Sequence, residues 1–233
     1  MTTARIPLLL TLIVPLAGHA QSDEDRDIYF GISHGNVTAT IHESDIERRI
    51  METPGLVTSS YIQNESPYND ISVGWCPWWE RRFCLEAKHI DNIHMLTRTT
   101  IESFSGSVTP MILDFGGTPL TIDAGSIGAS LIRELDVSVD EFSVLGRFPL
   151  NPTLSPFVQI SEFHYLARMH YRFEFPNPYG AYLGYDERKT GMFVAGSLGL
   201  DVNVNSRLFL RGVYTGIGTD RGRSLDFSVL YWF

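Results

Sequence analysis

Hydrophobic and polar side chains alternate along most of this chain. In the stretch GMFVAGSLGLDVNVNS (191–206) the even-numbered positions are mostly large and apolar, whereas the odd-numbered positions after Phe193 are small or polar. Successive side chains of a β-strand point to opposite faces, so this pattern predicts a strand with one apolar face. Apolar residues at helical spacing are nearly absent, and the chain is therefore predicted to be all-β.

Several segments share this alternation and are separated by short runs of Gly, Pro, Asn and Asp. The expected strands are residues 27–37, 56–63, 70–75, 141–150, 156–173, 191–204, 208–218 and 224–233. The connections NESPYN, NPTLS and NSR are short, and most connections at the other ends are long. We therefore predict an eight-stranded antiparallel up-and-down barrel. Residues 43–55 are expected to form a short helix in the first long connection, capped at Ser44 and ended by Pro54 and Gly55.

Residues 76–133 are too many for an ordinary connection. They include two strand-like runs, LEAKHIDNIHMLTRTTIESF and PMILDFGGTPLTIDAGSIGASLI. Either these runs extend a hairpin above the barrel, as a long second outer loop, or they add two strands and make ten. The interrupted sequence GGTPLTIDAGSIG favours the loop, because a lipid-facing strand needs regular alternation.

The alternation changes phase in two neighbouring strands. Apolar residues move from odd to even positions after Val139, and from even to odd positions after Ile160. A slip of one residue exchanges the two faces of a strand. We therefore predict β-bulges near residues 139–141 and 160–162.

The first segment, MTTARIPLLLTLIVPLAGHA, has one positive residue, an apolar run and small residues near its end. This composition predicts a secretory signal peptide, residues 1–20, cleaved after Ala20, which leaves residues 21–233 as one domain. The apolar run is too short to span a bilayer as a helix. The net charge of −9 argues against a nucleic-acid-binding surface, which needs basic residues.

Two features predict that the barrel spans a membrane. Short turns at one end and long connections at the other are typical of transmembrane barrels. The last strand ends in Tyr231, Trp232 and Phe233, and aromatic residues favour the membrane interface. A soluble, lipocalin-like barrel would bury its apolar faces inside. The small and polar residues on the alternate faces of the later strands favour the opposite arrangement, with lipid outside.

The segments FSVLGRFPLNPTLSPFVQI, GMFVAGSLGLDVNVNSRLFLRGVYTG and SLDFSVLYWF resemble the OmpA-like outer-membrane β-barrel family of Gram-negative bacteria. The resemblance implies an outer-membrane location. It also implies that the terminal strand is the signal read by the barrel-assembly machinery, through Phe227, Val229, Tyr231 and Phe233. No peptidoglycan-binding domain follows the barrel in this sequence, so the resemblance does not imply a cell-wall tether.

Charged residues on the inward faces must pair with one another, because a small barrel is filled by its own side chains. The expected lumen charge network consists of Glu141, Arg147, Glu162, His164, Arg211 and Asp226. Its expected role is structural, and a narrow ion path is the alternative. Cys76 and Cys84 are expected to form a disulfide in a secreted chain. A metal pair and two free thiols are the alternatives.

An enzymatic alternative is a lipid A-modifying barrel that hydrolyses an ester. Ser161, Glu162 and His164 are the local set that suggests it, but Ser161 faces away from the other two in a regular strand. No metal and no cofactor is expected, because there is no phosphate-binding glycine motif and the histidines lack metal-site spacing. These histidines are His34, His42, His89, His94, His164 and His170.

The expected function is therefore that of a non-enzymatic, monomeric outer-membrane barrel, structural or acting in surface contact. Its expected partners are outer-membrane lipid, lipopolysaccharide, the barrel-assembly machinery and a ligand on host cells or other bacteria. The segment FPNPYGAYLGY (175–185) is apolar and aromatic enough to be a contact surface. Alternatively, this segment folds back on the barrel rim.

Overall fold

A computed structural model of the chain describes residues 27–78, 82–105, 110–176, 182–216 and 222–233. The element order is β1 (Ile28–Ala39), α2 (Asp45–Met51), β2 (Leu56–Gln63), β3 (Glu65–Trp78), β4 (Phe83–Phe104), β5 (Met111–Phe115), β6 (Thr118–Ile122), the 3₁₀ turn η2 (Ala124–Ser126), β7 (Ser130–Arg147), β8 (Leu154–Glu174), β9 (Tyr182–Asn203), β10 (Leu208–Gly216) and β11 (Gly222–Trp232). No helix in these ranges is long and apolar enough to cross a membrane. The expected signal peptide lies outside the described residues.

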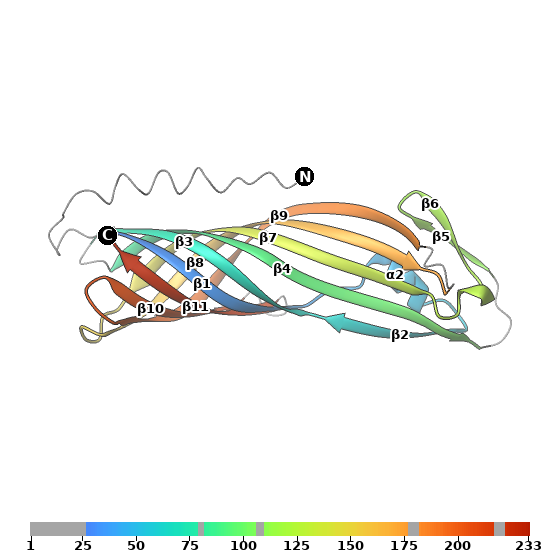
Figure 1. Cartoon of the computed structure of the whole chain (residues 1–233), viewed down its shortest axis with the longest axis horizontal. Coiled ribbons are helices and arrows are strands. Elements are labelled where there is room, and N and C mark those ends of the chain that lie inside the picture. The colour runs from blue at the N-terminus through green and yellow to red at the C-terminus, as the bar shows by residue number, and fades with distance from the viewer. Residues whose placement is uncertain (1–26, 79–81, 106–109, 177–181, 217–221) are drawn as a thin grey trace.

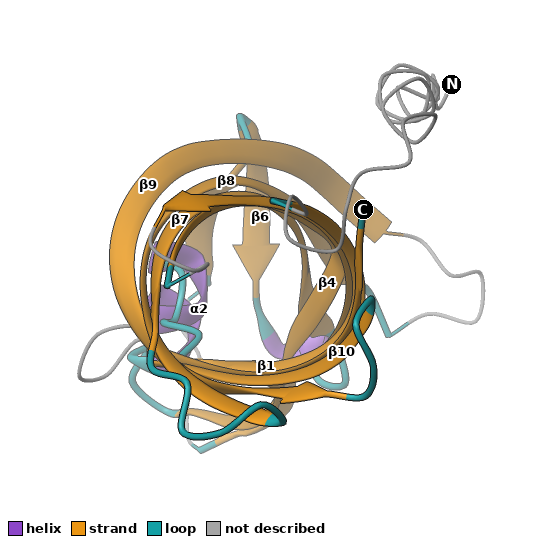
Figure 2. Ribbon diagram, turned by 90° about the vertical axis from the view of Figure 1, so that its left-hand side faces the viewer, coloured by secondary structure: helices purple, strands orange, loops and turns teal. Residues whose placement is uncertain are grey.

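Eight strands close into an antiparallel ring, as the sequence predicts. Their order is β4-β3-β1-β11-β10-β9-β8-β7, and β7 pairs again with β4. β1 pairs with β11, so the two ends of the barrel sequence lie side by side. Viewed along its axis, the sheet forms a complete circle (Figure 2). Where the ring is closed, every strand is hydrogen-bonded to a neighbour on each side, so this part of the barrel has no free sheet edge.

The prediction of a turn at NESPYN is wrong. β2 and β3 are separated by Asn64 alone and run along the same partner, with Gln63 opposite Leu96 and Asn69 opposite Asp91 of β4. They therefore act as one long strand. The chain instead turns after β3, within the segment expected to be a long outer loop, and β4 fills much of that segment. The count of eight is correct, but β4 takes the place in the ring that the prediction gave to residues 56–63.

The predicted bulges are also misplaced. β7 and β8 pair without a register shift from Ser130 opposite Glu174 to Arg147 opposite Phe157. In the neighbouring pair of β7 with β4, the register shifts in β4 between Ile90 and Ile93, where Asn92 has a positive φ of 65°. The extra residue of β4 exchanges its inward and outward positions, which is the usual effect of a β-bulge.

β8 changes polarity without changing phase. In its later half, the odd-numbered residues Phe163 and Tyr171 face inward and are buried. Nearer its start, the buried odd-numbered residues are the polar Gln159 and Ser161, which follow Phe157. The outward residues change in the opposite sense, from Ile160 to charged side chains. The inner face of β8 thus changes from polar to aromatic at the height where its outer face changes from apolar to charged. In the sequence, this double change looks the same as a register slip of one residue.

The strands have unequal lengths, so one side of the barrel rises above the other. β10 ends opposite β9 at Gly216, which pairs with Gly196, whereas β9 begins at Tyr182. We call residues 182–190 of β9, with the paired stretches 166–174 of β8, 130–138 of β7 and 93–104 of β4, together with β2, the upper wall. In Figure 1 these strands extend to the right, while β10 and β11 stay in the left half.

The concave side of the upper wall is covered by α2 and the β5–β6 hairpin. Ile50 of α2 and Phe115 of β5 belong to one buried cluster with Leu131, Tyr171 and Phe173 of the wall. Figure 1 shows α2, β5 and β6 gathered at the end of the molecule where the wall rises. The wall thus has a packed inner face and an outer face open to solvent.

The short helix begins where the sequence predicts. The Ser44 hydroxyl accepts a hydrogen bond from the Glu47 backbone at 3.2 Å, and the Glu47 carboxylate accepts one from the Ser44 backbone at 2.6 Å. This reciprocal pair satisfies two free N–H groups at the helix start. Glu47 also meets Arg133 of β7 at 3.3 Å and Thr97 of β4 at 2.5 Å. These contacts hold α2 inside the barrel mouth.

Candidate functional site

An apolar belt surrounds the half of the barrel that contains β10 and β11. Large hydrophobic side chains are exposed on all eight ring strands: Ile32 on β1, Ile71 and Trp75 on β3, Phe83 and Leu85 on β4, Phe142 and Val144 on β7, Val158 and Ile160 on β8, Met192, Val194, Leu198 and Leu200 on β9, Leu210 and Tyr214 on β10, and Leu225, Phe227, Val229 and Tyr231 on β11. Leu198, for example, is 63% exposed. A continuous apolar surface of this extent is unusual on a soluble monomer.

The belt ends at polar outward positions. On β1, Ile32 is followed two residues later by His34, and on β8 Ile160 is followed by Glu162. On β7, Asp140 comes two residues before Phe142. Since residues two apart share a face, the outer surface changes from apolar to polar within one step along each of these strands.

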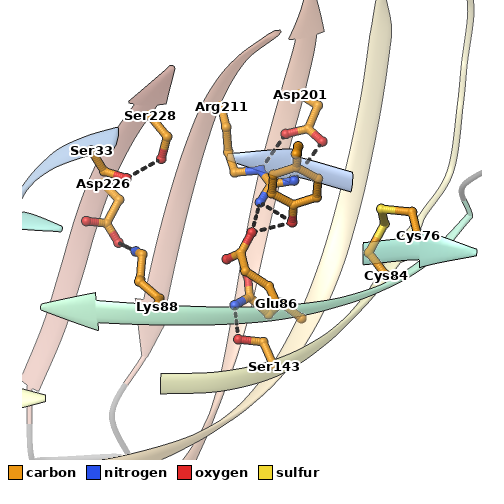
Figure 3. A network of polar contacts seen from close by, with 12 residues as sticks. Ser33, Cys76, Cys84, Glu86, Lys88, Ser143, Asp201, Arg211, Asp226 and Ser228 are labelled. Atoms are coloured by element: carbon orange, nitrogen blue, oxygen red, sulfur yellow. Dashed lines mark hydrogen bonds and ion pairs between the residues drawn. A yellow bond between two sulfur atoms is a disulfide. The ribbon is translucent and has the colours of Figure 1, made fainter. Parts of the chain in front are cut away.

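The interior at the level of the belt is charged. Arg211 of β10 binds both carboxylate oxygens of Asp201, at 2.7 and 3.1 Å, and meets Glu86 of β4 at 2.6 Å (Figure 3). Arg147 of β7 lies 2.7 Å from the same Asp201 carboxylate, and the Tyr29 hydroxyl donates to Glu86. All five residues are buried. Two guanidinium groups thus neutralise two carboxylates taken from different strands.

A second buried group is centred on Lys88 of β4. Its ammonium lies 3.1 Å from Asp226 of β11 (Figure 3). It also lies 3.2 Å from Asp70 of β3. The Tyr68 hydroxyl donates to Asp226. One cation therefore serves two carboxylates, and the lumen contains more buried acids than bases in the two groups taken together.

Glu141 of β7 forms the third buried polar group. Its carboxylate accepts hydrogen bonds from Ser161 at 2.6 Å, Gln159 at 2.8 Å and Ser143 at 3.1 Å. These partners are the small polar residues of the alternating strand pattern. They provide the donors that a buried carboxylate needs.

Apolar clusters close the lumen on both sides of these polar groups. The lower cluster contains Tyr29, Phe157 and Trp232, and the middle cluster contains Tyr68 and Phe163. Tyr29 and Tyr68 also bind the polar groups, so the clusters and the charges are in direct contact. Buried side chains therefore follow one another in the described interior from the lower cluster up to the packed mouth of the barrel.

The expected charge network is only partly inside. Glu141, Arg147, Arg211 and Asp226 are buried in the lumen. Glu162 and His164 instead point outward and pair with each other at 2.8 Å, both about half exposed. The correction follows from the regular pairing of β8: without a bulge, its even-numbered residues stay on the outer face. The aromatic residues between them face the interior.

Four charged members of the buried groups were not expected: Asp70, Glu86, Lys88 and Asp201. Glu86 and Lys88 alternate with Leu85 and Ala87, which is the belt pattern, but they lie in the segment interpreted as a loop. Asp201 lies on the small, polar face of the clearest strand. The alternation therefore contained the signal for these residues.

Cys76 and Cys84 form a disulfide at the turn between β3 and β4. Both cysteines are buried, and both belong to the lower cluster with Tyr29 and Trp232. The bond joins β3 to β4 at the lower end of the barrel. Cys76 donates its backbone N–H to Asp27 beside the start of β1, and β11 ends at this same end of the barrel.

The terminal strand presents its expected residues to the belt. Phe227 is 64% exposed, and Val229 and Tyr231 share its outward face. Phe233 donates its backbone N–H to Ile28 at 3.0 Å, so the chain is held to β1 as far as this residue.

The set that suggests ester hydrolysis is divided between the two faces of β8. Ser161 is buried and bonds Glu141, whereas His164 is on the outer face with Glu162. A hydroxyl nucleophile and its base must lie within hydrogen-bond distance. Ser161 and His164 do not meet this requirement.

Most of the six histidines that lack metal-site spacing pair with polar partners on the outer face. His89 meets Asp140 at 2.7 Å, His94 meets Asp136 at 2.8 Å, and His34 meets Asn69 at 3.0 Å. His42 uses its backbone carbonyl to accept from Arg133. Within the ranges that the structure describes, no three His, Cys, Asp or Glu side chains come together as a metal site.

The aromatic segment 175–185 falls partly outside the described residues, since 177–181 are not placed. Phe175 packs on Phe173 with ring centroids 5.3 Å apart, and Tyr185 stacks on Tyr171 at 4.6 Å. Tyr182 is 64% exposed. The described part thus combines residues folded onto the wall with one exposed aromatic ring.

Comparison with known proteins gives structural similarity alone. No family model matches the chain, and no curated protein matches its sequence. Among solved structures, the attachment invasion locus protein Ail of Yersinia pestis, in complex with a heparin analogue, is 10% identical with a TM-score of 0.43, and covers 89% of this chain and 97% of its own. Neisserial surface protein A is 11% identical with a TM-score of 0.44, and covers 88% of this chain and 97% of its own. The outer membrane protein OprG from Pseudomonas aeruginosa is 10% identical with a TM-score of 0.40, and covers 90% and 97%. Similarity at this level carries no information on the ligand of this chain.

Proposed function

We propose that this chain is a non-enzymatic outer-membrane β-barrel that anchors a surface-exposed wall. The observation that carries the proposal is the apolar belt around a polar, filled lumen. Lipid offers no hydrogen bonds, so a sheet can span it only as a closed barrel with an apolar outside. A soluble barrel would have the reverse arrangement.

The proposed orientation puts the upper wall outside the cell. Transmembrane barrels of this kind have short inner turns and longer outer segments. The turns after β7 and β9 are short, and the long strands, α2 and the β5–β6 hairpin are at the opposite end. Lipopolysaccharide would then surround the charged outward residues just above the belt. The barrel-assembly machinery would read the last strand during insertion.

Single cysteines test this topology, because the native pair is oxidised and the described residues contain no free thiol. Thr190→Cys lies on the outer face of the wall, and Thr153→Cys lies in the turn before β8. A membrane-impermeant maleimide should label Thr190→Cys on whole Gram-negative cells, and Thr153→Cys only after the outer membrane is permeabilised. Equal labelling of both variants, or recovery of the chain in the soluble fraction, would show that the proposal is wrong.

The non-enzymatic part of the proposal has a separate test. It is supported by the separation of Ser161 from His164. The mass spectrum of lipid A should be the same from cells with and without the protein. A lost acyl chain would contradict this part.

In the proposed function, the upper wall is the part of the molecule available for contact with host cells or other bacteria. A single closed ring is sufficient to hold this wall, so the proposed protein is a monomer.

A further inference from the structure

The outer face of the upper wall has a hollow of about 320 Å³ between β7, β8 and β9. The side chains around it are Glu134 of β7, His170 and Arg172 of β8, and Tyr182 and Asp186 of β9. They converge because of the register: Gly184 pairs with Arg172, Asp186 pairs with His170, and His170 pairs in turn with Glu134. Three adjacent strands therefore build the hollow from one face.

Gly184 is the residue that opens this hollow. It lies on the same face as Tyr182 and Asp186, two residues to either side. A Cβ atom at this position would lie 3.3 Å from the Tyr171 carbonyl oxygen and 3.7 Å from the Tyr182 ring. A larger side chain would project outward into the space between its neighbours. The absence of a side chain at Gly184 thus leaves the edge of the Tyr182 ring accessible.

The floor of the hollow is partly apolar. Ile132 of β7 is on the outer face but only 6% exposed. Its register partners are Arg98 of β4 and Arg172 of β8, whose aliphatic stems can cover an apolar neighbour while their charged ends stay in water. An apolar floor and an exposed tyrosine that is 64% accessible together offer a surface for the C–H groups of a ligand.

The charged groups around the hollow are paired with one another. His170 meets Asp186 at 2.8 Å, and Arg172 meets Glu174 at 3.1 Å and Glu134 at 3.8 Å. Donors and acceptors therefore alternate across the face with no block of one sign. Such a face gives little attraction to a strongly charged ligand. It suits a neutral molecule with many hydroxyl groups, each of which can donate and accept.

We propose that this hollow binds a neutral saccharide, with one sugar ring against Tyr182 and its hydroxyl groups hydrogen-bonded to Arg172, Asp186 and Glu134. The inference rests on the proposed function, because the hollow is available only if the upper wall stands outside the membrane. It names the ligand class for the surface-contact role. Pockets of this size are at the small end for ligand sites, so one or two sugar rings fit.

Retention of the full chain, folded in detergent micelles, on immobilised neutral oligosaccharides tests the proposal. The panel consists of oligomers of glucose, galactose, mannose and N-acetylglucosamine, with a sulfated heparin fragment as the charged comparison. We expect retention on at least one neutral oligomer. Tyr182→Ala and Gly184→Val should each weaken it by about tenfold or more, a loss within the range of a central binding contact.

Tyr61→Ala is the matched control. Tyr61 is 59% exposed on β2 of the same wall, where β4, β7 and β8 separate it from Tyr182 on β9, and its removal should leave retention unchanged. A shift on heating in detergent gels shows that each variant is folded. The saccharide site would be overturned if no neutral oligomer retained the protein, or if Tyr182→Ala were retained as well as the parent chain. Stronger retention on the heparin fragment than on the neutral oligomers would also overturn it. The cysteine-labelling result would be unaffected in these cases, so the two proposals can fail separately.

Discussion

Arg211 joins carboxylates from two different strands. Removing its guanidinium leaves Asp201 and Glu86 buried, with Arg147 as the remaining cation of the group. Breaking a buried ion pair from one side costs about 3–5 kcal/mol, because the remaining charge is uncompensated. Arg211→Ala should therefore lower the free energy of unfolding by about this amount, measured by denaturant titration in phospholipid vesicles.

Arg223→Ala is the control for that measurement. Arg223 is exposed on the outward face of the neighbouring strand, and exposed substitutions usually change stability by less than about 0.5 kcal/mol. If the two variants unfolded at the same denaturant concentration, the buried network would have no structural role.

The belt makes a second prediction at the level of single residues. Leu198 and Thr190 both point outward from β9, but Leu198 lies in the apolar belt and Thr190 lies in the wall. An arginine near the bilayer midplane costs about 2–4 kcal/mol, and one near the surface costs little. Leu198→Arg should be destabilised by this amount in vesicles, whereas Thr190→Arg should behave as the parent chain. Equal stability of the two variants would place the membrane elsewhere.

Among the elements, the bulge in β4 depends on one residue in an uncommon conformation. Asn92 has a φ of 65°, which asparagine and glycine tolerate better than branched residues. Asn92→Gly should keep the stability of the parent. Asn92→Val should lose about 1–2 kcal/mol in the same vesicle assay, because the left-handed conformation is strained for a branched side chain. A valine variant as stable as the glycine variant would show that the bulge shifts to another residue.

The elements also show how far the alternation pattern can be interpreted. It identifies residues 191–203 of β9 together with β10 and β11, whose surroundings are constant, but it misses residues 182–190 of β9. The cap of α2 is found from a local hydrogen-bonding signal. It fails at residues 64–69 and along β8, where the strand leaves the apolar belt and its outer face becomes polar. In the sequence, a polar run within a continuous strand looks the same as a turn. A strand whose inner face becomes apolar while its outer face becomes polar looks the same as a strand with a bulge.

The same limit explains the candidate sites. Glu141, Arg147, Arg211 and Asp226 were predictable because alternation places them opposite apolar neighbours. Their partners Glu86 and Lys88 could be predicted only if residues 83–104 were recognised as a strand, β4. The hollow at Gly184 depends on the register of three strands, and the sequence of one chain contains no signal for cross-strand neighbours so far apart.

For the whole molecule, this packing predicts a barrel without a continuous passage through the residues that the structure describes. The lower cluster, the three polar groups and the middle cluster follow one another along the lumen and share Tyr29 and Tyr68 as contacts. Above them, α2 and the β5–β6 hairpin pack in the mouth. An eight-stranded barrel is just wide enough to be filled in this way.

The purified protein should therefore give no stepwise ion conductance in planar bilayers. A path would need Lys88 or Arg211 to leave its carboxylate partners, at the cost of unpaired buried charge. A preparation from cells without the protein controls for contaminating porins. Discrete steps that appear only with this chain, and whose size changes in Lys88→Met, would show that ions cross the polar layer, and the ion-path alternative would then replace the closed anchor.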